Sequence, residues 1–405
     1  MDVVSAAEVQ AALGQLEAQL RATIEEEEIA GLSAAVVYNQ DTIWAKGFGY
    51  AKRETQTPAT PDTLYRIASI TKVFTTTMMM HLRDAGRLQL DDAVAKYLPE
   101  YQPKSHFRDA PPTTLRQLAS HTAGLPAEAQ GVNFNTLQYP DTAQFLASLA
   151  DVEIIIPPGE IKYSNLGIAI LGHALERAAG QPYGEYLRAN ILAPLGMNRS
   201  GLYPEATMRD QLAVSYAPER VPFTLTPPNL DSAALAPAEQ MYSSVEDIAR
   251  FIALQFRDGD NPAGGAQIIA GSSLREMHAP VALDPDWQTG IGIGFALQRL
   301  ADHTAVVATG GYLGYASNIT MIPALKLGVA IFANYLTGAE GIGYAALELL
   351  QPVFSAAIDR AESTIPAPAA WQKYVGFYAY PGHKGIDISI AKGKLVITSR
   401  LSGNT

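Results

Sequence analysis

The apolar residues near the start of the chain change from helical spacing to strand spacing. From Val9 to Ile24 they recur every three or four positions among Glu and Gln, which predicts an amphipathic helix over residues 6–28. Two β-rich runs, 31–37 and 42–49, then flank a polar turn. This succession predicts a hairpin that follows the helix.

A second helical pattern begins at Ile70 and ends near Gly86. It places Ser69 at the start of a helix. The middle of the chain, residues 105–270, is rich in helical segments separated by Pro and Gly loops, and this predicts a mainly α-helical region. The helices predicted there include 141–150, 166–180 and 244–257.

Short β-like runs return after the helical region, and a helix over 340–360 follows them. We expect these strands to join the N-terminal hairpin in one sheet. This order of elements predicts an α/β lobe (about 1–105 and 270–360) beside an all-α lobe (about 106–269). The predicted strands are 291–298, 304–308, 316–322 and 327–334.

The last part of the chain has a different pattern. Residues 361–371 are rich in Ala and Pro, which predicts a linker after a main domain over 1–360. Alternating apolar and polar residues then predict short strands in a β-rich module at 372–405. Such a segment is too short to be an independent domain, so we interpret it as a partial module.

The composition fits a folded globule that does not bind nucleic acid. Apolar residues make up 48% and charged residues 17% of the 405 positions, which argues against extensive disorder. The net charge is -11 and the basic residues are scattered, which argues against a nucleic-acid partner. The chain contains no cysteine, which excludes disulfides and thiolate catalysis but leaves the compartment open.

The N-terminal residues lack the pattern of a secretory leader, because acidic residues and helical periodicity stand where a basic region and an apolar run are expected. A cytoplasmic location stays open, as does a periplasmic or secreted one reached after removal of a leader. We also expect no segment long and apolar enough to span a bilayer. The sequence does not set the oligomeric state.

Ser69 and Lys72 form a Ser-x-x-Lys motif, and on a helix this spacing puts the hydroxyl and the amine one turn apart on one face. A serine hydroxyl needs an adjacent base, and a desolvated lysine can take its proton. Free backbone N–H groups at the helix start can hold the oxyanion that forms after attack. The alternative interpretation is a serine that caps the helix beside an exposed lysine.

The same spacing recurs at Ser389 and Lys392, within a strand-like run. Successive side chains of a strand point to opposite faces, so residues three positions apart point away from each other. We therefore interpret this second copy as accidental.

Tyr163, Ser164 and Asn165 lie on a predicted loop before the helix at 166–180. A tyrosine near a lysine can relay protons to a leaving group, and an asparagine amide can bind a substrate carbonyl. The alternative is a turn with a packed tyrosine. We interpret His121 as a structural hydrogen-bonding residue.

Ala308, Thr309, Gly310 and Gly311 follow an apolar, strand-like run. Glycines there would let a substrate lie along a strand edge, and the backbone N–H after Gly310 would be a second donor to the oxyanion. The alternative is a plain turn between two strands.

The three motifs, in the order Ser-x-x-Lys, Tyr-x-Asn and x-Thr-Gly, resemble those of the serine β-lactamase and penicillin-binding-protein superfamily, and in detail its class C branch with related esterases and D-peptidases. The resemblance extends over about residues 30–355. It is carried by DTLYRIASITKVFTT (62–76), GRLQLDDAVAKYLPEY (86–101), TLRQLASHTAGLP (114–126), PPGEIKYSNLG (157–167) and YSSVEDIARF (242–251).

The resemblance implies a β-lactamase/transpeptidase-like fold, α/β plus all-α, with an antiparallel sheet flanked by helices and the site between the lobes. It implies that Ser69 is acylated and that Lys72 and Tyr163 handle protons. Asn165 and the segment 308–311 would bind substrate, and backbone N–H groups of Ser69 and of that segment would hold the oxyanion. No metal or other cofactor is implied.

Ala308 departs from the family pattern, because the third motif normally begins with Lys or His, a cation that helps to bind a substrate carboxylate. We therefore expect neutral esters or amides to be preferred to penicillins or free D-Ala-D-Ala termini. The leading prediction is a serine hydrolase of small ester, amide, peptide or β-lactam substrates. The alternative is a binding or sensor protein that keeps the fold and turns substrate over slowly or not at all.

Overall fold

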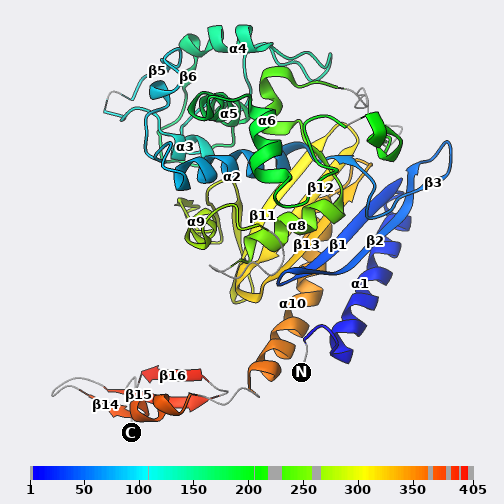
Figure 1. Cartoon of the computed structure of the whole chain (residues 1–405), viewed down its shortest axis with the longest axis vertical. Coiled ribbons are helices and arrows are strands. Elements are labelled where there is room, and N and C mark those ends of the chain that lie inside the picture. Colours follow the sequence, from blue (N-terminus) through cyan, green and yellow to red (C-terminus); the bar gives the residue numbers. More distant parts are fainter. Residues whose placement is uncertain are drawn as a thin grey trace. The chain divides into compact units, whose positions relative to one another are not determined.

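The computed structural model describes residues 3–107, 109–204, 206–217, 230–257, 266–363, 368–379, 385–391 and 394–399. The chain forms two compact units, Ala18–Leu347 and a smaller unit of Met1–Glu17 with Glu348–Thr405. The helices and strands are labelled in Figure 1. All residues predicted to form the site belong to the larger unit.

An antiparallel sheet forms the frame of the larger unit, with nine strands among the described residues. The buried strand β1 pairs with β2 on one side and with β13 on the other, so the two ends of the sequence meet in one sheet as predicted. The order across the sheet is β3 (Thr57–Pro58), β2 (Asp41–Lys52), β1 (Gly31–Tyr38), β13 (Leu327–Ala333), β12 (Tyr315–Ile322), β11 (His303–Tyr312), β10 (Ala296–Leu300), β9 (Thr289–Ile291) and β8 (Ala282–Leu283).

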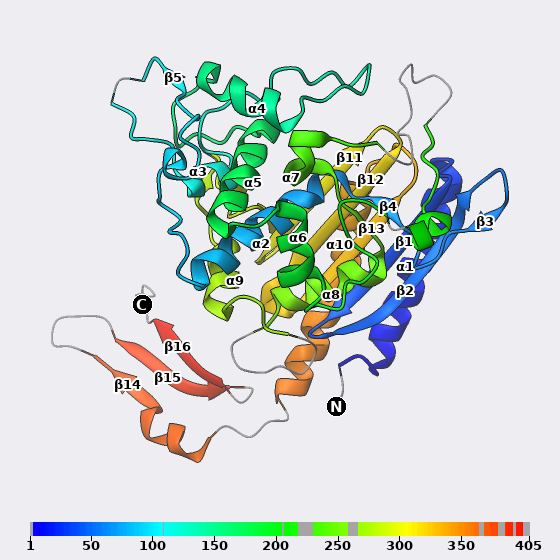
Figure 2. The ribbon, with the colours of Figure 1, turned by 45° about the horizontal axis from the view of Figure 1, so that its top comes forward.

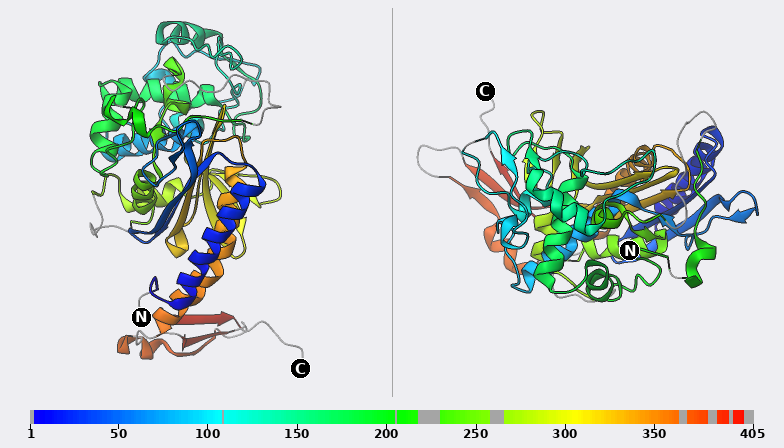
Figure 3. Two further views of the ribbon diagram at one scale, coloured as in Figure 1. Left: turned by 90° about the vertical axis from the view of Figure 1, so that its right-hand side faces the viewer. Right: turned by 90° about the horizontal axis from the view of Figure 1, so that it is seen from above.

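Helices cover both faces of this sheet, as Figure 3 shows edge-on. On one face α8 (Val245–Gln255) packs on β1, β2 and β13 and lies across them in Figure 2. On the other face α10 (Ala339–Ser363) begins, and there Glu340 accepts a hydrogen bond from Thr309 of β11. The helix α1 (Ala7–Glu26), predicted from the apolar spacing, brings Arg21 over the ring of Phe48 in β2.

The helical lobe is built around α5 (Asn165–Ala179), which is buried along most of its length. Its ends follow the capping rules, because the Ser164 side chain accepts from the N–H of Gly167 and Gly180 ends the helix with a φ of 63°. The helices in contact with α5 are α2 (Thr71–Asp84), α3 (Leu115–Ala119), α6 (Tyr183–Leu187) and α7 (Ala236–Glu239). The remaining helices of the larger unit named here are α4 (Thr142–Ser148) and α9 (Gly271–Met277).

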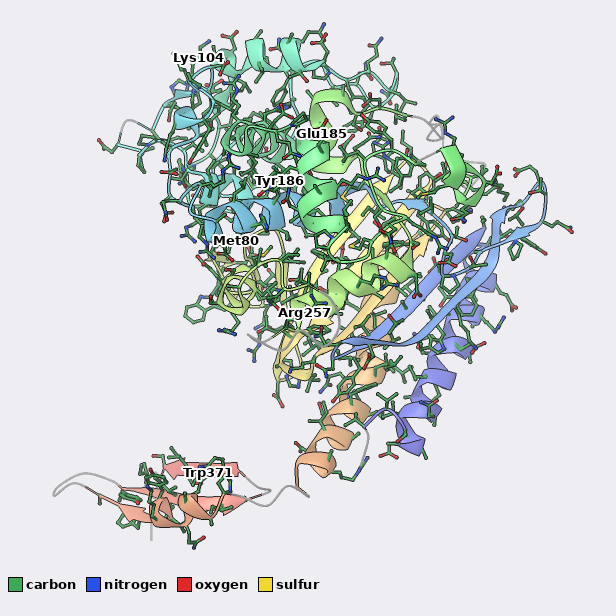
Figure 4. The ribbon with its side chains drawn as sticks, viewed as in Figure 1. Met80, Lys104, Glu185, Tyr186, Arg257 and Trp371 are labelled. Carbon is green, nitrogen blue, oxygen red and sulfur yellow. The ribbon has the colours of Figure 1, made fainter. Side chains whose placement is uncertain are left out.

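The helix α2 belongs to the hydrophobic core, and Met78, Met79 and Met80 on it have no exposed surface. Figure 4 shows Met80 on α2 and Tyr186 on α6, where the Tyr186 hydroxyl lies 2.7 Å from Nδ1 of His81. A helix held on all sides is a rigid support for side chains at its first turn. Lys72 lies in that turn, and Ser69 lies in the 3-10 turn directly before it.

One predicted strand is divided in two. The run 291–298 was expected to be continuous, but β9 ends at Ile291 and β10 begins at Ala296. Between them the chain turns, with a hydrogen bond from Gly292 N to Phe295 O and a φ of 82° at Gly294. A Cβ at Gly294 would lie 2.1 Å from Thr76 Oγ1, so the turn depends on glycine.

The smaller unit contains the antiparallel strands β14 (Gly376–Tyr378), β15 (Ile386–Ala391) and β16 (Lys394–Ser399), which follow a 3-10 helix that carries Trp371 (Figure 4). The helix α10 extends to Ser363. Strands therefore follow the main body, as expected, while the division into a domain over 1–360, a linker and a partial module stays a prediction.

The helix α10 corrects one expectation. We expected no segment long and apolar enough to span a bilayer, but Ala339–Ala361 meets that test by length and composition, with a mean hydropathy of 1.3. Within the structure 39% of this window is buried, and Leu347 is fully buried. A core helix of a globular protein passes the same test, so the segment is weak support for a membrane span.

Candidate active site

Ser69 lies in a 3-10 turn, Ala68–Ile70, that leads directly into α2. The N-cap residues of this turn and of α2 are Ile67 and Ile70, so the capping position is not Ser69. Ala68, the residue before it, has a φ of 46°, a left-handed conformation that costs a non-glycine residue about 1 kcal/mol or more. The backbone at Ser69 is thus held in a strained turn by the surrounding fold.

The Ser69 hydroxyl oxygen is bonded to both predicted proton-handling groups. Lys72 Nζ donates to Ser69 Oγ at 2.9 Å, and the Tyr163 hydroxyl lies 2.8 Å from the same oxygen. Lys72 also donates to Ala238 O at 2.9 Å and is only 3% exposed, unlike the surface lysine of the alternative interpretation. The three side chains therefore form one connected group.

The helix α7 is fixed to α2 beside this group. Thr75 Oγ1 donates to Pro237 O at 2.6 Å, and Met241 N donates to Thr71 Oγ1 at 3.0 Å. These bonds flank the bond from Lys72 to Ala238, so Nζ of Lys72 is held from the side of α7 as well as by Ser69.

His121 positions the Tyr163 loop. Its Nδ1 accepts from the backbone N–H of Ser164 at 3.2 Å, its carbonyl accepts from Lys162 N at 2.8 Å, and its ring centroid lies 4.7 Å from that of Tyr163. Burial, with a smaller contribution from Lys72, lowers the pKa of His121 to about 3, so the imidazole is neutral and can accept a bond. This confirms its structural role.

Asn165 begins α5 and is also bonded to the group. Its Oδ1 accepts from the Tyr163 hydroxyl at 3.1 Å, and its Nδ2 donates to Glu128 Oε1 at 2.7 Å. Glu128 was not singled out in the sequence. It follows the family-like segment that ends at Pro126 but belongs to no motif, so only the fold brings it to Asn165.

The segment Ala308–Gly311 lies inside β11 and is not a turn between strands. On one side β12 pairs with β11 as far as Tyr312, whereas on the other side β10 stops at Val307. The backbone from Ala308 onward therefore has one edge outside the ladder, as the strand-edge interpretation requires.

Gly310 allows β11 to approach the turn that carries Ser69. A Cβ there would lie 2.1 Å from Ile67 O, and Ser317 Oγ donates to the same carbonyl at 2.8 Å. Ala308 is 8% exposed and belongs to the core cluster. Thr309 donates to Glu340 at 3.2 Å, and its hydroxyl also accepts from Asn318, so its side chain is bonded within the protein.

Aromatic side chains follow this open edge. The ring of Phe134 lies 6.3 Å from the rings of both Tyr139 and Tyr312, and the two tyrosine hydroxyls are hydrogen bonded to each other. The sequence did not predict this contact, because Tyr312 ends β11 while the other two rings come from a loop without a motif. In the described part of the chain, no group of three His, Asp or Glu side chains is arranged to hold a metal ion.

The comparisons with known proteins agree with this architecture. The family model described as Beta-lactamase matches residues 14–351. Beta-lactamase-like protein 2 of Dictyostelium discoideum is 31% identical over 372 residues, which are 89% of this chain and 66% of that protein. The chain therefore spans slightly less than two thirds of that relative.

Solved structures give the same result. An octameric penicillin-binding protein homologue from Pyrococcus abyssi superposes with a TM-score of 0.73 at 25% identity, covering 96% of this chain and 88% of that one. A class C beta lactamase from Rhodobacter sphaeroides has the same fold, with a TM-score of 0.70 at 21% identity over 84% of this chain and 99% of that one. The chain thus has the β-lactamase/transpeptidase-like fold and belongs to the beta-lactamase family.

Proposed function

We propose that this chain is a serine hydrolase that acts through an acyl-enzyme on Ser69. The observation that carries the proposal is the position of the Ser69 hydroxyl, which is bonded to Lys72 Nζ at 2.9 Å and to the Tyr163 hydroxyl at 2.8 Å. A serine becomes a nucleophile when a neighbouring group can take its proton, and here two such groups touch the same oxygen.

The reaction has two steps. Ser69 Oγ attacks the substrate carbonyl carbon while its proton passes to the Lys72 and Tyr163 pair, and that pair returns a proton to the leaving alcohol or amine as its bond to carbon breaks. Water then attacks the acyl-enzyme, giving one proton to the same pair, and the acid is released as Ser69 regains its proton. Backbone N–H groups of Ser69 and Gly311 are proposed as donors to the oxyanion in both steps.

The substrates proposed are neutral esters and amides. Ala308 stands where the family pattern has a cation, and its methyl group supplies no charge that would bind a substrate carboxylate. D-Amino acid peptides and β-lactams could also form an acyl-enzyme on Ser69, but we expect them to be poorer substrates than neutral esters and amides.

The proposal is tested by intact-protein mass spectrometry after exposure to a fluorophosphonate, with wild type beside Ser69→Ala. One adduct on the wild type and none on the variant is expected. Turnover is then measured with p-nitrophenyl esters, D-amino acid amides and nitrocefin. A wild-type chain that forms no adduct would contradict the proposal, and a chain that is acylated by substrate but releases no product would favour the binding or sensor protein.

A further inference from the structure

The backbone proposed to hold the oxyanion has no side chain of its own to fix it. Gly310 and Gly311 lie near the end of β11, and a Cβ on Gly311 would meet no atom within 4 Å. Pairing with β12 fixes one edge of this backbone, while the other edge lies outside the ladder. Because glycine offers no side chain for packing, the position of the Gly311 N–H depends on its neighbours, of which Tyr312 comes directly after it.

Tyr312 lies against the guanidinium group of Arg66, whose central carbon is 4.3 Å from the centre of the tyrosine ring. Arg66 is fully buried and belongs to β4 (Tyr65–Arg66), three residues before Ser69. A guanidinium over an aromatic face at this distance attracts the ring, and more strongly where water is excluded. Arg66 therefore connects the segment that leads to Ser69 with the end of β11.

The same guanidinium is bonded to the segment that holds Lys72. Arg66 donates to Ser232 Oγ and, at 3.2 Å, to Gln240 Oε1. These two residues lie on either side of α7, whose Ala238 O accepts from Lys72. A purely structural role would explain these bonds, but it would not explain the contact with the ring of Tyr312.

The hydroxyl end of Tyr312 is held as well. It is hydrogen bonded to the hydroxyl of Tyr139, and burial, aided by the charge of Glu239, raises the pKa of Tyr312 to about 12, so this hydroxyl keeps its proton. Glu239 is 3% exposed and lies 3.9 Å from the guanidinium of Arg66. Tyr312 is thus held at its ring by Arg66 and at its hydroxyl by Tyr139.

We propose that Arg66 is a positioning residue for the oxyanion site, because by holding the ring of Tyr312 it fixes the preceding Gly311 N–H where the oxyanion forms. The inference rests on the proposed function. Arg66 is buried and acts through Tyr312, so it contributes to the transition state without touching the substrate. Its loss should therefore lower both the rate of acylation and the affinity for a transition-state analogue.

The test uses the full chain and the variants Arg66→Gln, Tyr312→Leu and the two combined. We measure kcat/KM for p-nitrophenyl acetate per active site, counting the sites by complete fluorophosphonate labelling so that misfolded chains do not contribute. Arg66→Gln is expected to lower this value by about a hundredfold, the usual effect of losing one oxyanion donor. Its inhibition constant for phenylboronic acid should rise by a similar factor, since the tetrahedral boronate on Ser69 places an oxygen in the oxyanion position.

The combined variant shows whether Arg66 acts through Tyr312. If it does, the double variant should lose no more than the worse of the single variants, whereas independent roles would multiply the two losses and overturn the inference. The matched control is Arg257→Gln, which removes another buried arginine, bonded to Gln40 and located just after α8 (Figure 4). It is expected to keep the wild-type kcat/KM and inhibition constant per active site.

Wild-type values per active site in Arg66→Gln would also overturn the inference. If Arg66→Gln yields no labelled chain, Arg66→Lys replaces it, because lysine keeps the charge but not the flat group that stacks on the ring. Arg66→Lys should show about tenfold changes in both quantities, and wild-type values would overturn the inference. A wild type that is labelled while the Arg66 variants match it removes only this inference, whereas a wild type without labelling removes the proposed function and this inference with it.

Discussion

Two segments of this chain carry the same Ser-x-x-Lys spacing, and within the described residues only the first has partners for chemistry. Ser69 lies before α2, where Lys72 Nζ and the Tyr163 hydroxyl reach its oxygen. Ser389 lies in β15 with an exposed side chain, opposite Val396 of β16, and Lys392 is outside the described residues. Whether the two side chains of a Ser-x-x-Lys can react together depends on the secondary structure that carries them. A helix brings the side chains of residues i and i+3 together, whereas a strand points them to opposite faces.

The largest effect is expected from removing the two serines in turn. Ser69→Ala should lower kcat/KM for a p-nitrophenyl ester by about a thousandfold or more, because loss of a nucleophile leaves only the binding contribution. Ser389→Ala should leave the rate unchanged. Steady-state kinetics of both variants measure this. An equal loss of kcat/KM in the two variants would contradict the claim that the Ser-x-x-Lys at Ser69 is catalytic and the one at Ser389 is not.

The second largest effect is expected from removing Lys72, the lysine of the Ser-x-x-Lys motif at Ser69. Lys72→Ala should slow acylation by about a hundredfold or more, since proton transfer by a positioned side chain contributes at least that much. The control is Lys104→Ala, which removes an exposed lysine (Figure 4) whose ion pair with Asp151 is on the surface. Pre-steady-state release of p-nitrophenol measures acylation, circular dichroism checks the fold, and an unchanged rate would make Lys72 merely structural.

A smaller effect is expected from restoring the cation of the family pattern. Ala308→Lys should raise the preference for a carboxylate-bearing ester over its methyl ester by about tenfold, the effect of one charged hydrogen bond. Thr304→Lys is the matched control, because it adds the same charge to β11 at an exposed position paired with Arg299 of β10. If the wild type already turned over both esters equally well, Ala308 would not govern carboxylate recognition.

Local patterns were sufficient to predict most of the fold. The helix α1, the hairpin of β1 and β2, and the helices α5 and α8 follow from apolar periodicity and from Ser and Gly at their ends. The sequence also led us to expect one sheet with strands from both ends of the domain, whereas it did not specify that β1 pairs with β13. The turn over Gly292–Phe295, which divides the strand predicted at 291–298, could not be predicted from the sequence, because apolar residues continue through it.

Most residues of the candidate site could also be predicted from the sequence. Ser69, Lys72, Tyr163 and Asn165 were chosen from their motifs, and the fold joins them by hydrogen bonds, while their roles in a reaction stay predictions. Glu128 could not be found in this way, because its relation to Asn165 depends on how the loop after α3 returns to the start of α5. Contacts between distant segments leave no trace in local spacing.

The central claim is that Ser69, and not the second copy of its motif, forms the acyl-enzyme. The most direct measurement is acid quenching of the wild-type chain during turnover of p-nitrophenyl acetate, followed by peptide mapping with tandem mass spectrometry. An acetyl group on Ser69, absent from Ser389 and lost on further incubation before the quench, is the predicted result. Acetylation elsewhere while Ser69 stays unmodified throughout turnover would contradict the account.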